Sequence, residues 1–147
     1  MPVIRAIGEK LNQTQAQSVL VPINLAGKIL CPDIPVDLYA DQLEQAMSIV
    51  QQRQATVGDI LTLDRKLGEE KKKWVHIAIV AHENETHPSI LAAIFMVLIE
   101  HVRDLEISSC AVPDLSSIPG SLRKEEVKLR LDAYLECYGM RTRFVLY

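Results

Sequence analysis

The chain has 147 residues and a formal net charge of −3, and hydrophobic residues make up 48% of the sequence. This length suits a single domain with one core, so we expect residues 1–147 to fold as one unit. A slightly acidic chain lacks the basic face that nucleic-acid binding requires, and no apolar run approaches the ~18 residues of a membrane span. Neither nucleic acid nor a membrane is therefore an expected partner.

The cysteines indicate the cellular compartment. Cys31, Cys110 and Cys137 are odd in number and lack the spacing of metal ligands, which favours reduced thiols in a cytoplasmic protein. The amino-terminal residues also lack the uninterrupted apolar core of a signal peptide. The sequence therefore predicts an unexported, cytoplasmic chain with no bound metal and no cofactor.

The start of the chain predicts two strands. Residues 2–7 are short, apolar and β-branched, which favours an edge or second strand that stops at Gly8. Residues 12–17 are polar and predict a loop or a short helical turn. Residues 18–23 predict a strand buried on both faces, which should end near Pro22 because a proline inside a central strand removes a ladder hydrogen bond.

A helix and a hairpin come next. Pro35 suits the first turn of a helix, and apolar side chains at helical spacing over residues 38–52 predict an amphipathic helix with one face on the sheet. Residues 55–63 predict a loop followed by a strand. The charged residues 68–73 then predict the exposed turn of a hairpin that leads into the next strand.

Residues 73–113 organise the rest of the chain. They predict a strand over 74–80, a helix over 89–105 and a strand over 107–112. Two apolar strands that flank a long helix are typical of a parallel sheet with a right-handed crossover, because such strands are covered on both faces. The sequence therefore predicts an α/β fold.

The last elements complete the sheet. Apolar positions over residues 121–138 predict a final helix, which should end at Gly139 in the left-handed conformation. Residues 141–147 predict a closing strand. In that strand Phe144 and Leu146 alternate with Arg143 and Val145.

Ligands of open α/β sheets bind beyond the carboxyl ends of the strands, so functional residues should follow the strands. The chain contains no Gly-rich dinucleotide motif, no P-loop, no nucleophile elbow and no paired metal histidines. Four ionisable side chains follow the 74–80 strand: His82, Glu83, Glu85 and His87. Such a group could bind a metal or shuttle a proton, although plain solvent-exposed polarity is the favoured interpretation.

Several other polar or reactive residues have structural interpretations. His76 lies inside a predicted strand and is expected to be a packed core or edge histidine, whereas His101 falls on the polar side of its helix and should lie at the surface. Cys110 lies in an apolar strand, where a thiol behaves as a small buried hydrophobe. Trp74 begins a strand and is expected to be a packing residue.

Two loops carry the parts of an anion site. After the second strand, Asn24, Gly27 and Lys28 offer an amide, a flexible glycine and a cation, which could hold a ribose and a phosphate or form a plain strand-to-helix turn. Residues 114–121 offer hydroxyls, a glycine and the amino end of the final helix, from which a phosphate site can be built. We expect the two loops to converge on one crevice.

Several local strings resemble those of the macrodomain family, whose α/β/α fold binds ADP-ribose. Gly8-Glu9-Lys10-Leu11 resembles the family's Gly-Asp-Ile-Thr, and residues 19–24, Val-Leu-Val-Pro-Ile-Asn, resemble its Val-Ile-Val-Asn-Ala-Ala-Asn. Residues 56–58 resemble the Gly-containing step before the middle strands, and residues 107–113 resemble the Ser-Ile-Ala-Phe-Pro strand. The resemblance covers nearly the whole chain and implies a three-layer α/β/α sandwich with a mixed sheet.

The resemblance also implies roles for individual residues. By position, Glu9 would contact the base, Asn24 the ribose, and Gly27 and Lys28 one phosphate. Four residues of the second loop would contact the other phosphate or its surroundings: Asp114, Ser116, Ser117 and Gly120.

The chain departs from the family at both loops. Macrodomains carry a run of three glycines after the Asn, whereas here Gly27 alone remains, and the second loop lacks the family's Gly-Thr-Gly. The middle of the chain is most similar to the branch that removes ADP-ribose from DNA bases. That branch has a catalytic lysine in a Phe-Pro-Thr-Lys string, and His82 stands at the lysine's position here.

Three functions follow as hypotheses. The first is binding of ADP-ribose or a related nucleotide by a degenerate macrodomain without efficient turnover. The second is an ADP-ribosyl hydrolase acting on modified protein or DNA, with His82 as general base and Asn24 orienting the ribose. The third is a scaffold with a closed pocket, acting through a protein partner or as a homo-oligomer.

Overall fold

The computed structural model describes residues 3–66 and 72–147, which form a six-stranded sheet in the order β1-β6-β5-β2-β4-β3. Neighbouring strands run parallel except for β4 and β3, which are antiparallel. The strands are β1 (Val3–Arg5), β2 (Ser18–Asn24), β3 (Ile60–Lys66), β4 (Lys72–Ala81), β5 (Ser109–Val112) and β6 (Arg143–Leu146). The sheet is therefore mixed, as predicted.

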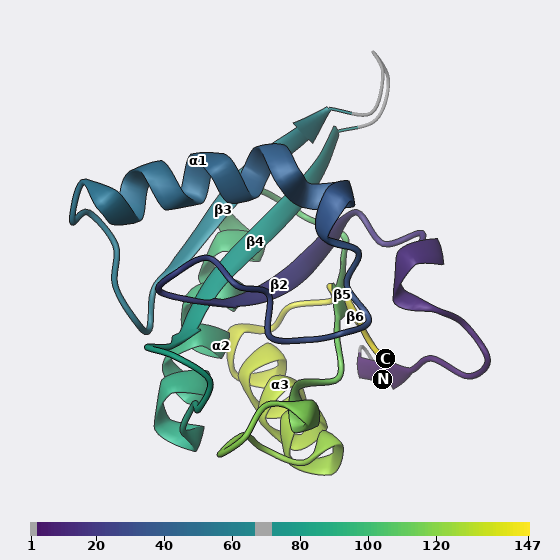
Figure 1. Cartoon of the computed structure of the whole chain (residues 1–147). Helices are drawn as coiled ribbons and strands as arrows, with labels where there is room; N and C mark the ends of the chain where they lie inside the picture. The colour runs from purple at the N-terminus through teal and green to yellow at the C-terminus, as the bar shows by residue number, and fades with distance from the viewer. Residues whose placement is uncertain (1–2, 67–71) are drawn as a thin grey trace.

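Helices cover both faces of the sheet (Figure 1). On one face α1 (Ala40–Gln51) lies over β3 and β4, and on the other α2 (Pro88–Asp104) and α3 (Lys124–Tyr138) pack side by side. Short 3₁₀ helices form η1 (Leu11–Gln13), η2 (Val36–Tyr39) and η3 (Leu115–Ser117). This arrangement confirms the predicted α/β fold with its three layers. Among the helices of the described residues, none combines the length and the apolar character needed to cross a membrane.

The central strands are buried because they have helices or loops on both sides. All seven residues of β2 are buried, as are the residues of β4 from Val75 to Ala81. The chain leaves β4, crosses one face of the sheet through α2 and returns as β5, with β2 between the two strands. The parallel crossover predicted for this segment is thus present, although β5 begins at Ser109 and Ile107 lies before the strand.

Pro22 lies inside β2, so the prediction that the strand ends there is wrong. β5 pairs only with Ser18 and Val19 at the start of β2. Beyond Val19, the segment that follows β2 turns back and lies along the side that β5 leaves open. There the Leu30 amide donates to the Pro22 carbonyl at 3.0 Å. The nitrogen and carbonyl of one strand residue point to the same side, so the nitrogen of Pro22 faces away from the β4 ladder and costs it no hydrogen bond.

The ends of other elements also differ from the predictions. The first strand is confined to Val3–Arg5. Of the predicted hairpin turn 68–73, Lys72 and Lys73 belong to β4, and the rest lies outside the described residues. The final helix begins at Lys124 rather than at residue 121.

Capping interactions explain where α3 starts and stops. At its start, the Arg123 amide donates to Glu126 Oε1 at 3.4 Å, and Arg123 Nε lies 3.0 Å from the same oxygen. A residue whose amide is capped in this way stands outside the first turn, so Arg123 precedes the helix. At its end, Gly139 has φ +62°, which confirms the predicted left-handed cap.

His76 on β4 lies in the core, as predicted. Its ring is fully buried, with Nδ1 2.8 Å from the Thr62 hydroxyl, which in turn lies 2.7 Å from Nδ1 of His101 on α2. This contact leaves His101 half-buried, so the surface position predicted for it is wrong. Burial, with a smaller contribution from His101, lowers the pKa of His76 to about 3.

We expect acid to destabilise the fold through His76. Its pKa is 6.5 when exposed and about 3 in the native chain, so below pH 6.5 the unfolded chain binds a proton that the native chain does not. Above the unfolded pKa the ring is neutral in both states, so protonation of His76 does not reduce the free energy of unfolding. As the pH falls from that value toward the folded pKa, the free energy of unfolding decreases by at most roughly 1.4 kcal/mol per pH unit. Urea unfolding from neutral pH to about pH 4 should give a shallower pH slope in His76→Gln than in wild type. Equal slopes would contradict this assignment.

Candidate functional site

The loops that follow β2, β4 and β5 lie together at the carboxyl edge of the sheet. Three hydrogen bonds link them: Asn24 Nδ2 to the Glu83 carbonyl at 2.7 Å, the Thr86 amide to the Pro119 carbonyl at 2.9 Å, and Cys31 Sγ to the Asp114 carbonyl at 3.5 Å. The loops in which the sequence places its candidate residues therefore converge.

Cys31 fills the space between the loops after β2 and β5. Its side chain is 3% exposed, and its sulfur accepts a long hydrogen bond of 3.9 Å from the Ser117 hydroxyl. Burial raises the pKa of the thiol to about 12. The hydrogen bond from Ser117 opposes this shift, whereas the negative charges of Asp114 and Asp33 add to it. A neutral buried thiol therefore closes the two loops against each other at this point.

Asn24 organises the loop after β2 through its own side chain. Asn24 is 6% exposed, and Oδ1 accepts from the amides of Ala26 and Lys28, each at 3.0 Å. The Gly27 amide donates to the Asn24 carbonyl, and the Leu25 amide donates to the end of β4. All four amides from Leu25 to Lys28 are thus used inside the protein, so this loop presents no free main-chain cradle for a phosphate.

Gly27 is a packing residue of this loop. Its φ is +88°, and a Cβ at this position would lie 2.8 Å from Sδ of Met47 on α1. The next residue, Lys28, is exposed. The loop is therefore a tight turn against α1, which is one of the two interpretations that the sequence left open, and its cation remains accessible at the carboxyl edge.

We expect Asn24→Ala to destabilise the protein by roughly 2–4 kcal/mol, because it removes two hydrogen bonds to amides and one to a carbonyl in a buried position. Asn84→Ala is the matched control, since Asn84 is exposed in the neighbouring loop and should cost less than about 0.5 kcal/mol. Urea unfolding measures both variants. Similar losses in the two variants would show that the Asn24 amide does not support the turn.

The loop after β5 is built around Asp114. Its Oδ1 accepts from the amide of Ser116 at 3.1 Å and from the Ser116 hydroxyl, and its carbonyl accepts from the Ser117 hydroxyl at 2.8 Å. Its Oδ2 lies 3.5 Å from Nζ of Lys124 at the start of α3. The Asp114 carboxylate therefore holds the loop, whereas the exposed hydroxyl oxygens of both serines can still accept hydrogen bonds.

Gly120 allows close contact between the loops after β4 and β5. Its φ is +81°, and a Cβ there would lie 2.3 Å from the carbonyl oxygen of Thr86. Thr86 is itself 4% exposed. A side chain at position 120 would therefore have to push the two loops apart.

Gly120→Ala should lower the free energy of unfolding by about 2–4 kcal/mol, because left-handed strain and steric overlap add. Gly8→Ala is the control, because Gly8 has φ +72° but no atom lies within 4 Å of its Cβ position. This variant should therefore lose only the about 1–2 kcal/mol of left-handed backbone strain. Chemical denaturation of both variants gives the comparison. A loss no greater in Gly120→Ala than in Gly8→Ala would exclude the proposed overlap.

The histidines of the loop after β4 are not gathered into one site. His82 is exposed, and the bond from Asn24 to the Glu83 carbonyl brings its loop beside Asn24. His87 instead caps α2, with Nδ1 accepting from the Ser89 amide at 3.1 Å. Within residues 3–66 and 72–147, no three metal-ligating side chains are grouped closely enough to hold an ion.

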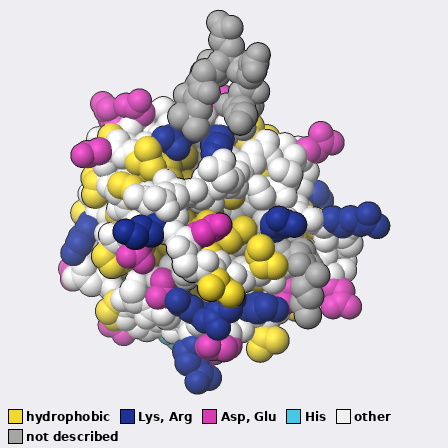
Figure 2. All heavy atoms as spheres, turned by 90° about the vertical axis from the view of Figure 1, so that its right-hand side faces the viewer, with side chains coloured by type: hydrophobic (Ala, Val, Ile, Leu, Met, Phe, Trp, Pro, Cys, Tyr) yellow, Lys and Arg dark blue, Asp and Glu magenta, His cyan; other side chains and the backbone are white. Residues whose placement is uncertain are grey.

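Glu9 lies in a hollow of about 360 Å³ beside β1 and β6, at the opposite end of the sheet from α1. Figure 2 shows the side of the molecule that carries the two chain ends, where apolar, basic and acidic side chains alternate. The side chains that line the hollow include Ile4, Arg5, Glu9, Arg143, Val145 and Tyr147. Tyr147 also borders a narrow gap of about 10 Å³ beside Ser116 and Lys124, so the hollow adjoins the loop after β5.

Sequence reasoning found Glu9 but missed the other residues of the hollow. Arg5 and Tyr147 stand near opposite ends of the chain and belong to no motif. They meet because β1 pairs in parallel with β6, with Val3 opposite Phe144. The available signal was the pairing of the first and last strands, which local patterns do not specify.

Solved structures provide a comparison for this arrangement. The macrodomain of Mycobacterium tuberculosis DarG has a TM-score of 0.77 at 20% identity, with 99% of this chain and 96% of that chain covered. The chain has the macrodomain fold. Thermosipho africanus DarTG in complex with ADP-ribose has a TM-score of 0.74 at 18% identity, covering 99% of this chain and 41% of that one. A macrodomain protein from Streptomyces coelicolor has a TM-score of 0.61 at 12% identity, with 92% and 90% covered.

The macrodomain fold is the fold that the sequence resemblance implied. No protein-family model and no curated protein matches the sequence. Asn24 ends β2 at the carboxyl edge of the parallel strands, whereas Glu9 lies in the segment that leads from the end of β1 back to the start of β2.

Proposed function

We propose that this macrodomain binds ADP-ribose or a related nucleotide without efficient turnover. The observation that carries the proposal is the hollow of about 360 Å³ beside β1 and β6 that is lined by Glu9. Its volume falls within the range of small-molecule sites, and apolar walls with a few polar groups are typical of such sites. Ile4, Val145 and Tyr147 offer contact for a planar base, and the Glu9 carboxylate can accept from an exocyclic amine.

The phosphates of such a ligand would be held by side chains. The amides of Leu25 to Lys28 are occupied, so the loop after β2 would contribute mainly the exposed ammonium of Lys28. Next to the hollow, Ser116 offers a hydroxyl and Lys124 a cation that is shared with Asp114. Exposed charges contribute little in water, so the base should supply most of the affinity.

The absence of efficient turnover rests on the two residues with proposed catalytic roles. His82 is exposed, and no hydrogen bond within the described residues orients its ring, whereas a general base must be positioned against the proton it removes. The Asn24 oxygen already accepts two amide hydrogen bonds. An ADP-ribosyl hydrolase with His82 as base therefore remains the alternative hypothesis.

A scaffold function is the second candidate. Cys31 closes the space between the loops after β2 and β5, and the amides that would cradle a phosphate are engaged. A macrodomain closed in this way would act through a protein partner or a second copy of itself. Thermosipho africanus DarTG, compared above, was solved with ADP-ribose bound, which supports the nucleotide hypothesis instead.

Calorimetry with ADP-ribose and AMP tests the proposal. We expect the two affinities to agree within about tenfold. The second phosphate and distal ribose of ADP-ribose should add little binding energy, because the amides of the loop after β2 are already hydrogen-bonded within the protein. Glu9→Ala should weaken both ligands by roughly 3–100-fold, which corresponds to one hydrogen bond to a charged group. Glu44→Ala, an exposed position on α1, is the charge-matched control and should leave both affinities unchanged.

Each other outcome has a defined meaning. No heat with either ligand at millimolar concentration would refute the nucleotide hypothesis and favour the scaffold. Binding of ADP-ribose roughly a thousandfold tighter than AMP would show that a main-chain cradle forms, against the side-chain binding proposed here. Release of ADP-ribose from modified protein or DNA, lost in His82→Ala, would establish the hydrolase.

A further inference from the structure

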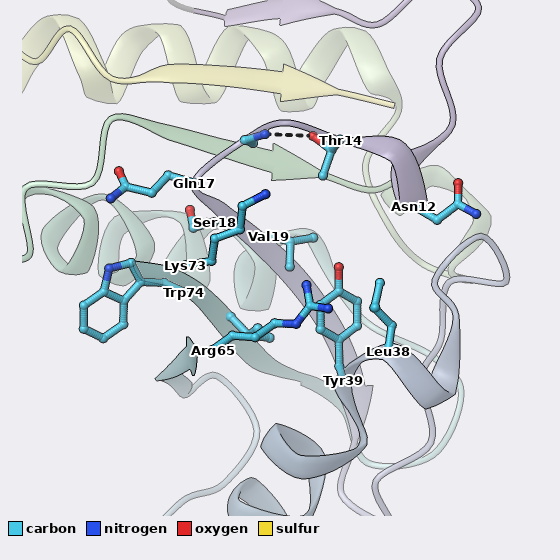
Figure 3. Close-up of a pocket in the computed structure, with 12 residues that line it drawn as sticks. Asn12, Thr14, Gln17, Ser18, Val19, Leu38, Tyr39, Arg65, Lys73 and Trp74 are labelled. Carbon is cyan, nitrogen blue, oxygen red and sulfur yellow. Dashed lines mark hydrogen bonds between the residues drawn. The ribbon is translucent and has the colours of Figure 1, made fainter. Parts of the chain in front are cut away.

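A second hollow lies at the amino ends of β2 and β4, at the opposite edge of the sheet from Asn24. It adjoins the hollow that contains Glu9, because Thr14 and Ala16 line both. Its volume is about 40 Å³. Figure 3 shows that four segments distant in sequence enclose it: the stretch from η1 into β2, the end of η2, the end of β3 and the start of β4. A hollow enclosed by four separate segments is built by the tertiary fold and not by one loop.

Two cations line this hollow, and no carboxylate of the described residues lines it with them. Arg65 on β3 and Lys73 on β4 are directly opposite in the antiparallel register, where like charges repel. Within the described residues neither forms an ion pair with a carboxylate, and no Asp or Glu lines the hollow. The nearby amide oxygen of Gln17 turns away and accepts from Ser108 at 2.7 Å. The hollow is therefore positive and lined by donors.

Tyr39 adds an uncharged donor. Its side chain is 3% exposed, yet its hydroxyl points into the hollow and has no hydrogen-bond partner among the described residues (Figure 3). The guanidinium of Arg65 lies over the ring, 5.2 Å from its centroid, which holds both groups in place. Burial, partly offset by Arg65, raises the pKa of the Tyr39 hydroxyl, so it keeps its proton at neutral pH. A hydroxyl that faces a hollow and has no protein partner is free to donate to a ligand that accepts.

We propose that this hollow binds a single phosphate group, as inorganic phosphate or as the phosphate of a small monoester, between Arg65, Lys73 and the Tyr39 hydroxyl. A space of about 40 Å³ is of the size of one such group and is too small for a nucleoside. A bound dianion would remove the repulsion between the two cations and would accept the free hydroxyl hydrogen. Thr14 and Ala16 line both hollows, but Arg65, Lys73 and Tyr39 do not line the larger one and Glu9 does not line the smaller one, so the two proposed sites use different side chains.

Thermal unfolding of the full chain in sodium phosphate, with sodium chloride at matched ionic strength as reference, tests the proposal. We expect a saturable rise in Tm with phosphate beyond that with chloride. Arg65→Gln and Lys73→Gln should each weaken the response at least about tenfold, and Tyr39→Phe roughly threefold to tenfold. Arg53→Gln, which removes a charge at the far end of α1, is the matched control and should keep the wild-type response.

Glycerol phosphate as a second probe separates the two sources of the group. A response to phosphate alone assigns the free ion, and a response to both assigns a monoester; either supports the site. An equal response in wild type, Arg65→Gln and Lys73→Gln, or no rise beyond chloride, would overturn the proposal. If Arg65→Gln does not fold, Lys73→Gln and Tyr39→Phe decide the outcome. Glu9→Ala should keep the phosphate response, so that a failure of the nucleotide site is distinguishable from a failure of this one.

Discussion

The side-chain amide of Asn24 is the interaction on which the carboxyl edge of the sheet depends. It ends the buried strand β2, accepts two amides of the turn that follows and donates to the loop after β4. One residue thereby fixes two loops and consumes the donors that would otherwise face a ligand. The same bonds that stabilise the edge leave the turn after β2 without free main-chain donors for a ligand.

Local patterns in the sequence were sufficient for the architecture. Continuous apolar runs predicted β2 and β4, and the long apolar face of α2 predicted the crossover, because burial on both faces leaves no polar positions in such strands. Pro22 was misplaced, since whether a proline costs a ladder bond depends on how far the neighbouring strand extends. That length is a property of the assembled sheet and not of the segment.

The sequence was less informative about the sites. Motif resemblance led to Asn24 and Gly27, but their hydrogen bonds and packing against Met47 appear only in three dimensions. The hollow that holds Arg65, Lys73 and Tyr39 follows no motif, because its cations meet through an antiparallel register. Two hollows of different size therefore lie next to each other, on either side of the segment that contains Thr14 and Ala16.

The pairing of β1 with β6 has a consequence for how the molecule assembles. It joins Val3 to Phe144, so the polypeptide must be almost complete before the first strand has a neighbour. Closing so long a loop is entropically costly, and β1 offers only three residues in return. We therefore expect β1 to dock late in folding, after β2, β4 and α2 have formed the nucleus. The wall of the larger hollow would then be the last part of the protein to form and the first to open.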